Sequence, residues 1–248
     1  MKKIYIVLSF TGTVLSRIIK FYTKNEFAHV SVALDEELEE KLKNVPKEKG
    51  ILIVTDGVFS MSGEICNLPK LVELKKKYGA KLMVDDAHGF GILGEHGRGT
   101  GEYYGLEEEI DLITGTFSKS LASLGGFCVG DRKVIDFIRH TSRPFIFAAS
   151  IPPTAIAAVR KSLEIIKREP ERIKNLLDIS DYMREALRTR GIKFIESKTP
   201  IISIYTYDAE TTLKACKLLY EKGVYVNSVL PPATPANINS CIIYCLGV

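Results

Sequence analysis

The sequence predicts an α/β fold built around a mostly parallel β-sheet. Three apolar runs, at residues 51–54, 82–84 and 112–114, each indicate a short buried strand that is followed by polar residues. Between the first two runs, an amphipathic helix is expected to begin after Asn67 and to end at Gly79. A strand–helix–strand unit is most simply parallel, so the polar residues after the strands are expected at one edge of the sheet.

The rest of the chain predicts further strands and helices. Before the first of these strands we expect a strand, a helix, a strand and a charged helix, at residues 4–8, 14–22, 29–34 and 35–44. After the third we expect a strand at 126–129, a helix capped by Asp131, and long helices at 153–168 and 171–190. A smaller unit follows, with strands at 192–195, 201–205 and 224–226 and a helix at 209–222.

Composition narrows the class of protein. With 46% hydrophobic and 26% charged residues, the chain has the composition of an ordinary soluble globular protein. The formal net charge of +4 comes without a long basic tract, so nucleic acid is not an expected partner. No segment is long and apolar enough to predict a membrane span. Five cysteines without a C-x-x-C pair are typical of reduced thiols and predict a cytoplasmic protein.

Lys119 lies in a hydroxyl-rich turn directly after the third predicted strand, in the stretch DLITGTFSKS at residues 111–120. Partial burial at such a position lowers the pKa of an ammonium group and leaves an amine that can attack a carbonyl. Thr116 and Ser118 beside it offer hydroxyl donors suited to an anionic oxygen such as that of a phosphate. Considered alone, this stretch has an alternative interpretation as a loop lysine among turn residues.

Five segments between residues 47 and 235 are distinctive: TDGVFSMSGE, VDDAHGFGILGEHGRG, TGTFSKSLASLGGF, SRPFIFAASIPP and VNSVLPPATP. Through them the chain resembles the α-oxoamine synthase family of pyridoxal-phosphate enzymes. The family includes glycine C-acetyltransferase, 8-amino-7-oxononanoate synthase and serine palmitoyltransferase. The resemblance implies a fold type I large domain with a mostly parallel sheet, incomplete here, at residues 47–190. It also implies a truncated α/β C-terminal domain at 191–248, after an atypical N-terminal segment at 1–46.

The resemblance assigns roles around a cofactor ring. Lys119 would hold pyridoxal 5'-phosphate as a Schiff base and then remove a proton from the substrate's Cα. Asp85 would pair with the pyridine nitrogen, which keeps the ring protonated and able to store electrons. His88 would lie by the phenolic oxygen of the ring and orient the substrate, and Ser60 would donate to that same oxygen. All four residues follow predicted strands.

The resemblance further implies how the phosphate is bound and what is made. Thr116 would bind the cofactor phosphate, and Ser150 would reach the phosphate of a neighbouring subunit in a homodimer. The expected substrates are an amino acid and an acyl-coenzyme A, condensed to a 2-amino ketone with loss of carbon dioxide in most members. Two alternatives stay open: an inactive or cofactor-poor remnant of such an enzyme, and another fold type I activity such as an aminotransferase.

Two further observations bear on these alternatives. Both ends depart from the family pattern, because residues 1–46 lack the phosphate-binding turn and residues 237–248 lack the arginine that grips the substrate carboxylate. His29 only faintly matches the ring-stacking histidine.

A metal site built from carboxylates and imidazoles, at Asp85, Asp86, His88 and His96, is not expected, because adjacent strand residues point to opposite faces.

Overall fold

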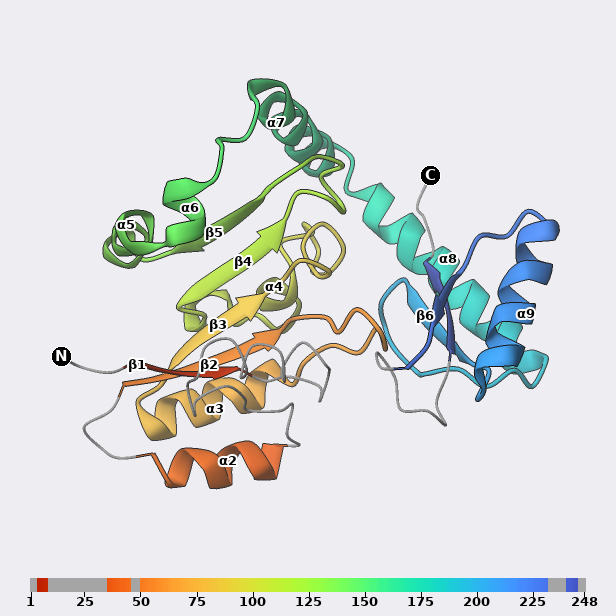
Figure 1. Ribbon diagram of the computed structural model, residues 1–248, viewed down its shortest axis with the longest axis horizontal. Coiled ribbons are helices and arrows are strands. Elements are labelled where there is room, and N and C mark those ends of the chain that lie inside the picture. Colours follow the sequence, from red (N-terminus) through yellow and green to blue (C-terminus); the bar gives the residue numbers. More distant parts are fainter. Residues whose placement is uncertain (1–3, 9–34, 46–49, 232–239, 245–248) are drawn as a thin grey trace. The chain divides into compact units, whose positions relative to one another are not determined.

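The computed structural model describes residues 4–8, 35–45, 50–231 and 240–244 (Figure 1). The chain forms two compact units, which are described separately. The first unit comprises Met1–Gly57 and Cys66–Glu169, and the second comprises Val58–Ile65 and Pro170–Val248. The domain boundaries expected after residues 46 and 190 stay predictions.

The first unit contains a five-stranded sheet. Its strands, in chain order and also in spatial order, are β1 (Ile4–Leu8), β2 (Gly50–Asp56), β3 (Lys81–Asp85), β4 (Leu112–Thr116) and β5 (Gly126–Gly130). The first four are parallel to one another, and β5 pairs with β4 in the antiparallel direction. The prediction of an α/β fold with a mostly parallel sheet is therefore confirmed.

Helices of the first unit connect and cover these strands. They are α2 (Asp35–Lys43), α3 (Leu68–Tyr78), α4 (Thr100–Tyr104), the 3-10 turn η1 (Glu107–Glu109), α5 (Arg132–Thr141), α6 (Arg143–Phe147) and α7 (Pro153–Arg168). As expected, the Asn67 side chain caps α3 by accepting from the backbone N–H of Lys70, and Gly79 ends it in the left-handed conformation at φ 63°. In Figure 1, α3 lies against the sheet with α2 beyond it.

One part of the core of the first unit lies between α3 and the sheet. Leu68 and Leu74 of α3 and Leu82 and Val84 of β3 have no solvent exposure. The apolar face of the helix and one face of the strand are thus buried together, as the hydrophobic periodicity of each predicts.

The second unit is an α/β arrangement of its own. It contains α8 (Glu171–Thr189), β6 (Ile201–Tyr205), α9 (Ala209–Glu221), β7 (Asn227–Val229) and β8 (Ser240–Tyr244). The strands form an antiparallel sheet in the order β6-β8-β7. Helix α8 contacts β6, and α9 contacts both β7 and β8.

Two strand predictions in the second unit were wrong in part. Residues 192–195 make only an isolated bridge, between Phe194 and Ile204, instead of a strand. The strand expected at 224–226 lies three residues later, at Asn227–Val229. Both errors have one cause: apolar residues favour an extended backbone, but the pairing partner decides where a ladder forms. The helix and strand predicted at 14–22 and 29–34 lie outside the described residues.

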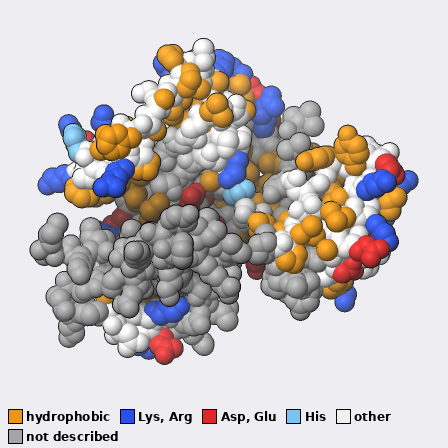
Figure 2. Space-filling model, viewed as in Figure 1, with side chains coloured by type: hydrophobic (Ala, Val, Ile, Leu, Met, Phe, Trp, Pro, Cys, Tyr) orange, Lys and Arg blue, Asp and Glu red, His pale blue; other side chains and the backbone are white. Residues whose placement is uncertain are grey.

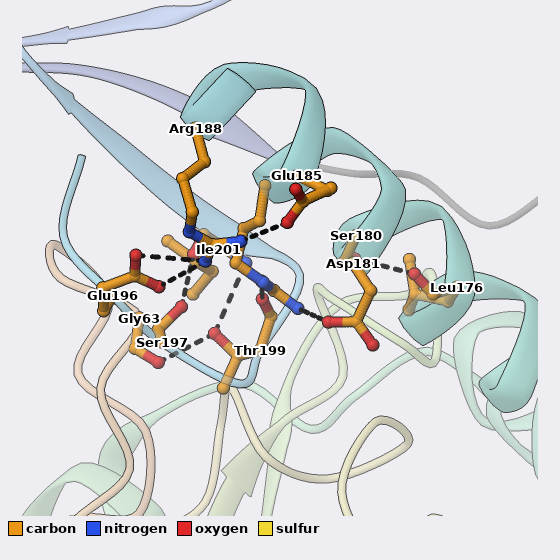
Figure 3. Close-up of polar contacts among 11 residues, drawn as sticks. Gly63, Leu176, Ser180, Asp181, Glu185, Arg188, Glu196, Ser197, Thr199 and Ile201 are labelled. Atoms are coloured by element: carbon orange, nitrogen blue, oxygen red, sulfur yellow. Dashed lines mark hydrogen bonds and ion pairs between the residues drawn. The ribbon is translucent and has the colours of Figure 1, made fainter. Parts of the chain in front are cut away.

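A buried arginine joins helix α8 to the segment before β6, and its two partners, Asp181 and Thr199, are labelled in Figure 3. Arg184 of α8 is 5% exposed and donates to the carbonyl of Thr199 and to Asp181, each at 2.6 Å. The hydroxyl of Thr199 donates in turn to the carbonyl of Gly63 at 2.8 Å. Gly63 has a φ of +76°, and a Cβ there would lie 2.5 Å from the carbonyl oxygen of Ile201. The short segment 58–65 is thereby fixed to the strand that begins at Ile201.

Replacing Leu82 with alanine is expected to destabilise the first unit by about 2–5 kcal/mol, because a fully buried leucine leaves a cavity. The free energy of unfolding in urea measures the effect. Leu213→Ala is the matched control, since Leu213 of α9 is 53% exposed and its truncation should change stability by less than about 0.5 kcal/mol. Equal losses in the two variants would contradict the described core.

Candidate active site

Acidic and hydroxyl side chains meet at the carboxyl ends of β2, β3 and β4. Asp56 is the register partner of Asp85, and Asp85 is the register partner of Thr114. Residues paired in this way on neighbouring strands point to the same face of a sheet, with Cα atoms roughly 4.8 Å apart. The sheet therefore presents a row of three polar side chains on one face, at the edge where parallel α/β folds bind ligands.

Lys119 lies in the loop between β4 and β5, which leaves and re-enters the sheet at this edge. The backbone N–H of Phe117 donates to Gly125 at 2.9 Å, and that of Ser123 donates to Phe117 at 2.7 Å. The hydroxyl groups of Thr116 and Ser118 are 2.8 Å apart. These contacts close the loop and fix its backbone on both sides of Lys119.

A hydrogen bond also joins the loop that carries Lys119 to the loop after β3. The hydroxyl of Ser120 donates to the carbonyl of Phe90 at 2.8 Å. Gly91, at φ +81°, faces Ser120 so closely that a Cβ there would lie 2.4 Å from the serine Cβ. Only glycine fits this approach. The segment that carries His88 and the segment that carries Lys119 are thus held against each other.

The ionisable groups of the site shift one another's pKa values. Loss of hydration lowers the pKa of Lys119, although solvent still reaches the side chain, and the nearby carboxylates of Asp85 and Asp56 oppose this shift. Burial and the charge of Lys119 lower the pKa of His88 to about 4, against the effect of Asp85. At neutral pH the imidazole of His88 is therefore uncharged, and the amine of Lys119 is easier to deprotonate than an ordinary lysine.

The carboxylate of Asp86, the residue after Asp85, is buried and fixes the loop after β3. It accepts from the backbone N–H of Thr100 at 2.7 Å and from the hydroxyl of Thr100 at 2.6 Å. Three glycines pack around it, and a Cβ at Gly57, Gly89 or Gly99 would approach an Asp86 oxygen to 2.5 Å or less. Asp86 is 1% exposed. The pKa of its carboxyl is raised by burial, and the two hydrogen bonds from Thr100 oppose that shift.

One polar atom in the row has no partner. The hydroxyl of Thr114, the register partner of Asp85, is buried and makes no hydrogen bond within the described residues. A buried hydroxyl without a partner costs free energy, and such groups in native proteins usually have a functional or solvent partner. A ligand polar atom at this edge could accept from it.

The structure brings four of the predicted site residues to one end of the first unit's sheet. Asp85, His88, Thr116 and Lys119 all lie at the carboxyl edge of the first unit's sheet. Ser60 belongs to the second unit, in the turn closed by the bridge between Val58 and Ile65, so its part in the site stays a prediction.

The described residues do not test the roles of Ser150 and His29. Ser150 is exposed, between α6 and α7, and makes no hydrogen bond to another described residue. Its role at the phosphate of a neighbouring subunit stays a prediction. His29, the faint match to the ring-stacking histidine, lies outside the described residues.

Three of the four residues of the metal interpretation have separate partners. Asp85 accepts from the backbone N–H of Ala87 at 3.0 Å, whereas Asp86 is occupied by Thr100. The imidazole Nδ1 of His96 lies 2.6 Å from Glu102. Within the described ranges, no three metal-ligating side chains converge.

Sequence reasoning missed Asp56, Thr114 and the pair formed by Asp86 and Thr100. Asp56 stands at the head of the segment DGVFSMSG, but no role was assigned to it. A signal was present, because two neighbouring predicted strands are each followed within two residues by an aspartate. Using it requires the register of the two strands, which only the sheet supplies.

Known proteins share both the sequence and the fold of this chain. The sequence profile described as "Aminotransferase class I and II" matches residues 11–242. The chain belongs to the aminotransferase class I and II family. Its resemblance to the α-oxoamine synthases is confirmed within that family by a serine palmitoyltransferase of Sphingobacterium spiritivorum, which is 46% identical over 201 residues. That alignment covers 81% of this chain and 50% of the relative.

Two further members extend the comparison. An 8-amino-7-oxononanoate synthase of Thermosipho melanesiensis is 41% identical over 199 residues, which are 80% of this chain and 51% of the relative. A solved serine palmitoyltransferase with pyridoxal phosphate as an internal aldimine superposes with a TM-score of 0.90 at 31% identity. That match covers 99% of this chain and 62% of the solved chain. The fold is thus that of the α-oxoamine synthases, and the chain spans about half the length of the curated relatives it matches.

His88 is expected to stay uncharged until the pH falls to about 4. Its pKa in the folded chain lies below the value of about 6.5 for an unfolded chain, so the folded state binds fewer protons between these values. This group therefore contributes stability that is present above about pH 6.5 and is lost as the pH falls toward 4. NMR titration of the imidazole measures the midpoint, with the urea-unfolded chain as reference and His88→Gln identifying the resonance.

A Lys119→Met variant serves as the control for that titration. It removes a positive charge that disfavours the imidazolium, so the midpoint of His88 should move to higher pH. A midpoint near the unfolded reference in the unchanged protein would contradict the described burial of His88.

Proposed function

We propose that this chain binds pyridoxal 5'-phosphate at the carboxyl edge of the first unit's sheet and takes part in a C-acyl transfer. The reaction would condense an amino acid with an acyl-coenzyme A to a 2-amino ketone, with release of free coenzyme A and carbon dioxide. The observation that carries the proposal is the cluster of Lys119, Asp85 and His88, in which the pKa of the amine is lowered beside a carboxylate and an uncharged imidazole.

The side chains at this edge suit the cofactor. Lys119 offers an amine for an aldehyde, Asp85 offers a carboxylate for a pyridine nitrogen, and the hydroxyl pair of Thr116 and Ser118 offers donors for a phosphate. The buried hydroxyl of Thr114 beside Asp85 lacks a partner that a ligand could supply. A solved relative of the same fold holds this cofactor.

Each residue would then have a defined task. When bound, pyridoxal phosphate supplies an aldehyde that joins an amine and a ring that takes up electrons released at the amino acid's Cα. Lys119 would bind the aldehyde carbon through its Nζ and would accept the proton that leaves Cα. Asp85 would hold a proton on the ring nitrogen, because a carboxylate stabilises the cationic form. His88, uncharged at neutral pH, would hydrogen-bond the phenolic oxygen and orient the substrate.

The remaining predicted contacts complete this proposal. Thr116 would donate to the phosphate, Ser60 would donate to the phenolic oxygen, and Ser150 would reach the phosphate bound by a second subunit. Ser150 is exposed in the segment between α6 and α7, which leaves its hydroxyl available for such a contact.

The substrate is proposed from the relatives. Several of the most similar curated proteins are named serine palmitoyltransferase, and others are named 8-amino-7-oxononanoate synthase. Serine with a long-chain acyl-coenzyme A is therefore the first pair to offer, followed by alanine and glycine with shorter thioesters. No described helix could cross a bilayer, on the grounds of length and apolar content. A cytoplasmic location stays a prediction.

A homodimer is part of the proposal, and its surface would lie on α5 and α6 (Figure 2). Figure 2 shows hydrophobic side chains gathered on this part of the molecule, and Phe137, Phe145 and Phe147 are 62%, 62% and 81% exposed. In the part of the chain that the structure describes, neither helix contributes a buried residue. An exposed apolar patch of this kind marks a surface that another protein covers, here a second copy of the chain.

Lys119→Ala is expected to abolish the Schiff-base absorption band that forms with added pyridoxal phosphate, together with any turnover, because Lys119 is the amine that interacts with Asp85 and His88 in the described part of the chain. Borohydride reduction followed by peptide mapping identifies the modified lysine. Lys76→Ala is the matched control, since Lys76 of α3 is exposed and paired with Glu109, and it should behave as the unchanged protein. Trapping of the cofactor on another lysine would falsify the assignment.

Phe147→Asp is expected to weaken the proposed homodimer by at least about tenfold in dissociation constant, because it places a charge in an apolar interface. Sedimentation velocity over a range of concentrations measures the effect. Tyr220→Asp, at an aromatic residue of α9 that is 69% exposed, is the control and should leave association unchanged. A chain that is monomeric at all concentrations would contradict the dimer.

A further inference from the structure

Asp56 is a second carboxylate at the candidate site. It is the last residue of β2 and the register partner of Asp85, so the two side chains point to the same face of the sheet. We propose that Asp56 is a positioning residue of this site: the carboxylate that faces the Lys119 amine as counter-charge while Asp85 is engaged by the ring nitrogen. This inference rests on the proposed function for the engagement of Asp85, but the pairing of Asp56 with Lys119 does not require a cofactor.

The backbone holds Asp56 firmly in place. The N–H of Gly57 donates to the carbonyl of Asp85 at 2.8 Å, and the carbonyl of Gly57 accepts from Cys66 at 2.9 Å. A Cβ at Gly57 would lie 2.3 Å from the hydroxyl of Thr100, so only glycine fits there. The two aspartates therefore cannot move apart without breaking the ladder between β2 and β3.

The side chain of Asp56 is left without a hydrogen bond. Its solvent-accessible carboxylate accepts from no group in the described ranges of the chain, whereas Asp85 accepts from Ala87 and Asp86 accepts from Thr100. Loss of hydration and the neighbouring Asp85 raise the pKa of Asp56, and Lys119 lowers it. Of the three aspartates at this edge, Asp56 is the one whose carboxylate has a cation nearby and no donor already bound.

Other ionisable groups around the pair do not supply the same charge. His88, which also faces Lys119, is uncharged at neutral pH, because its pKa lies at about 4. Cys66 feels both Asp86 and Asp56, and burial raises the pKa of its thiol to about 12, so it is uncharged as well. The charged groups that act on Lys119 within the described residues are thus Asp85 and Asp56.

The position of Asp56 has a chemical consequence for the proposed reaction. When Lys119 accepts the proton that leaves the substrate's Cα, its Nζ becomes a cation. A carboxylate facing that cation stabilises it, while a carboxylate already paired with the ring nitrogen does so less. Asp56 would therefore favour the protonated form of Lys119 without touching the substrate.

Competitive acetylation of the full chain, stripped of carbonyl compounds with hydroxylamine, tests the pairing. Acetic anhydride reacts only with unprotonated amines, so the labelling of Lys119 against pH, read by peptide mass spectrometry, reports its protonation. In Asp56→Asn, Lys119 should label about threefold faster at about pH 8, with the midpoint at lower pH, because an attractive charge is lost. Asp56→Glu, which keeps the charge, should restore slow labelling.

Glu108→Gln is the matched control. Glu108 is an exposed residue of η1, at the opposite edge of the sheet, and its removal changes the net charge equally. A labelling profile for Asp56→Asn that superposes on the unchanged protein, or an equal change in Glu108→Gln, would overturn the proposal. If Asp56→Asn does not fold by circular dichroism, Asp56→Ser takes its place. No pyridoxal phosphate is added, so a failure here leaves the borohydride result at Lys119 standing, and the reverse also holds.

Discussion

The buried carboxylate of Asp86 is the constraint on which the candidate site depends. It lies between Asp85 and His88 in sequence, and its two hydrogen bonds from Thr100 set the path of the loop that carries both. Three glycines surround it because no larger residue fits. An ionised carboxylate in such a place is costly unless it is fully hydrogen-bonded, so the loop has little freedom to rearrange. The side chains that would carry out the chemistry are thus held in place by the hydrogen bonds between Asp86 and Thr100, which take no direct part in that chemistry.

The site itself combines opposing electrostatic effects. Loss of hydration disfavours the charged form of Lys119, while Asp85 and Asp56 favour it. The same loss of hydration removes the charge of His88. One amine, one neutral imidazole and two carboxylates at a sheet edge can therefore hold a proton at one position and release it at another. This property follows from the register of β2 and β3 and from the short loop after β4.

Much of the fold could be predicted because its signals are local. The helix expected at 153–168 is Pro153–Arg168, and its apolar spacing and preceding proline are visible in the sequence itself. The strand expected at 201–205 is Ile201–Tyr205. The bridge at Phe194 shows the limit, because an extended apolar run does not reveal whether a neighbour is present to form a ladder. Lys119 stands out by its position after a strand, whereas Asp56 gains its meaning only from the strand beside it.

The turn at residues 58–65 has a consequence for biosynthesis. Its anchor, Thr199, lies 136 residues later in the chain than Gly63. A ribosome adds residues at about 5–20 per second, so this turn emerges on the order of ten seconds before its partner exists. The turn can therefore complete its contacts with the segment before β6 only late in synthesis, after Thr199 has been added.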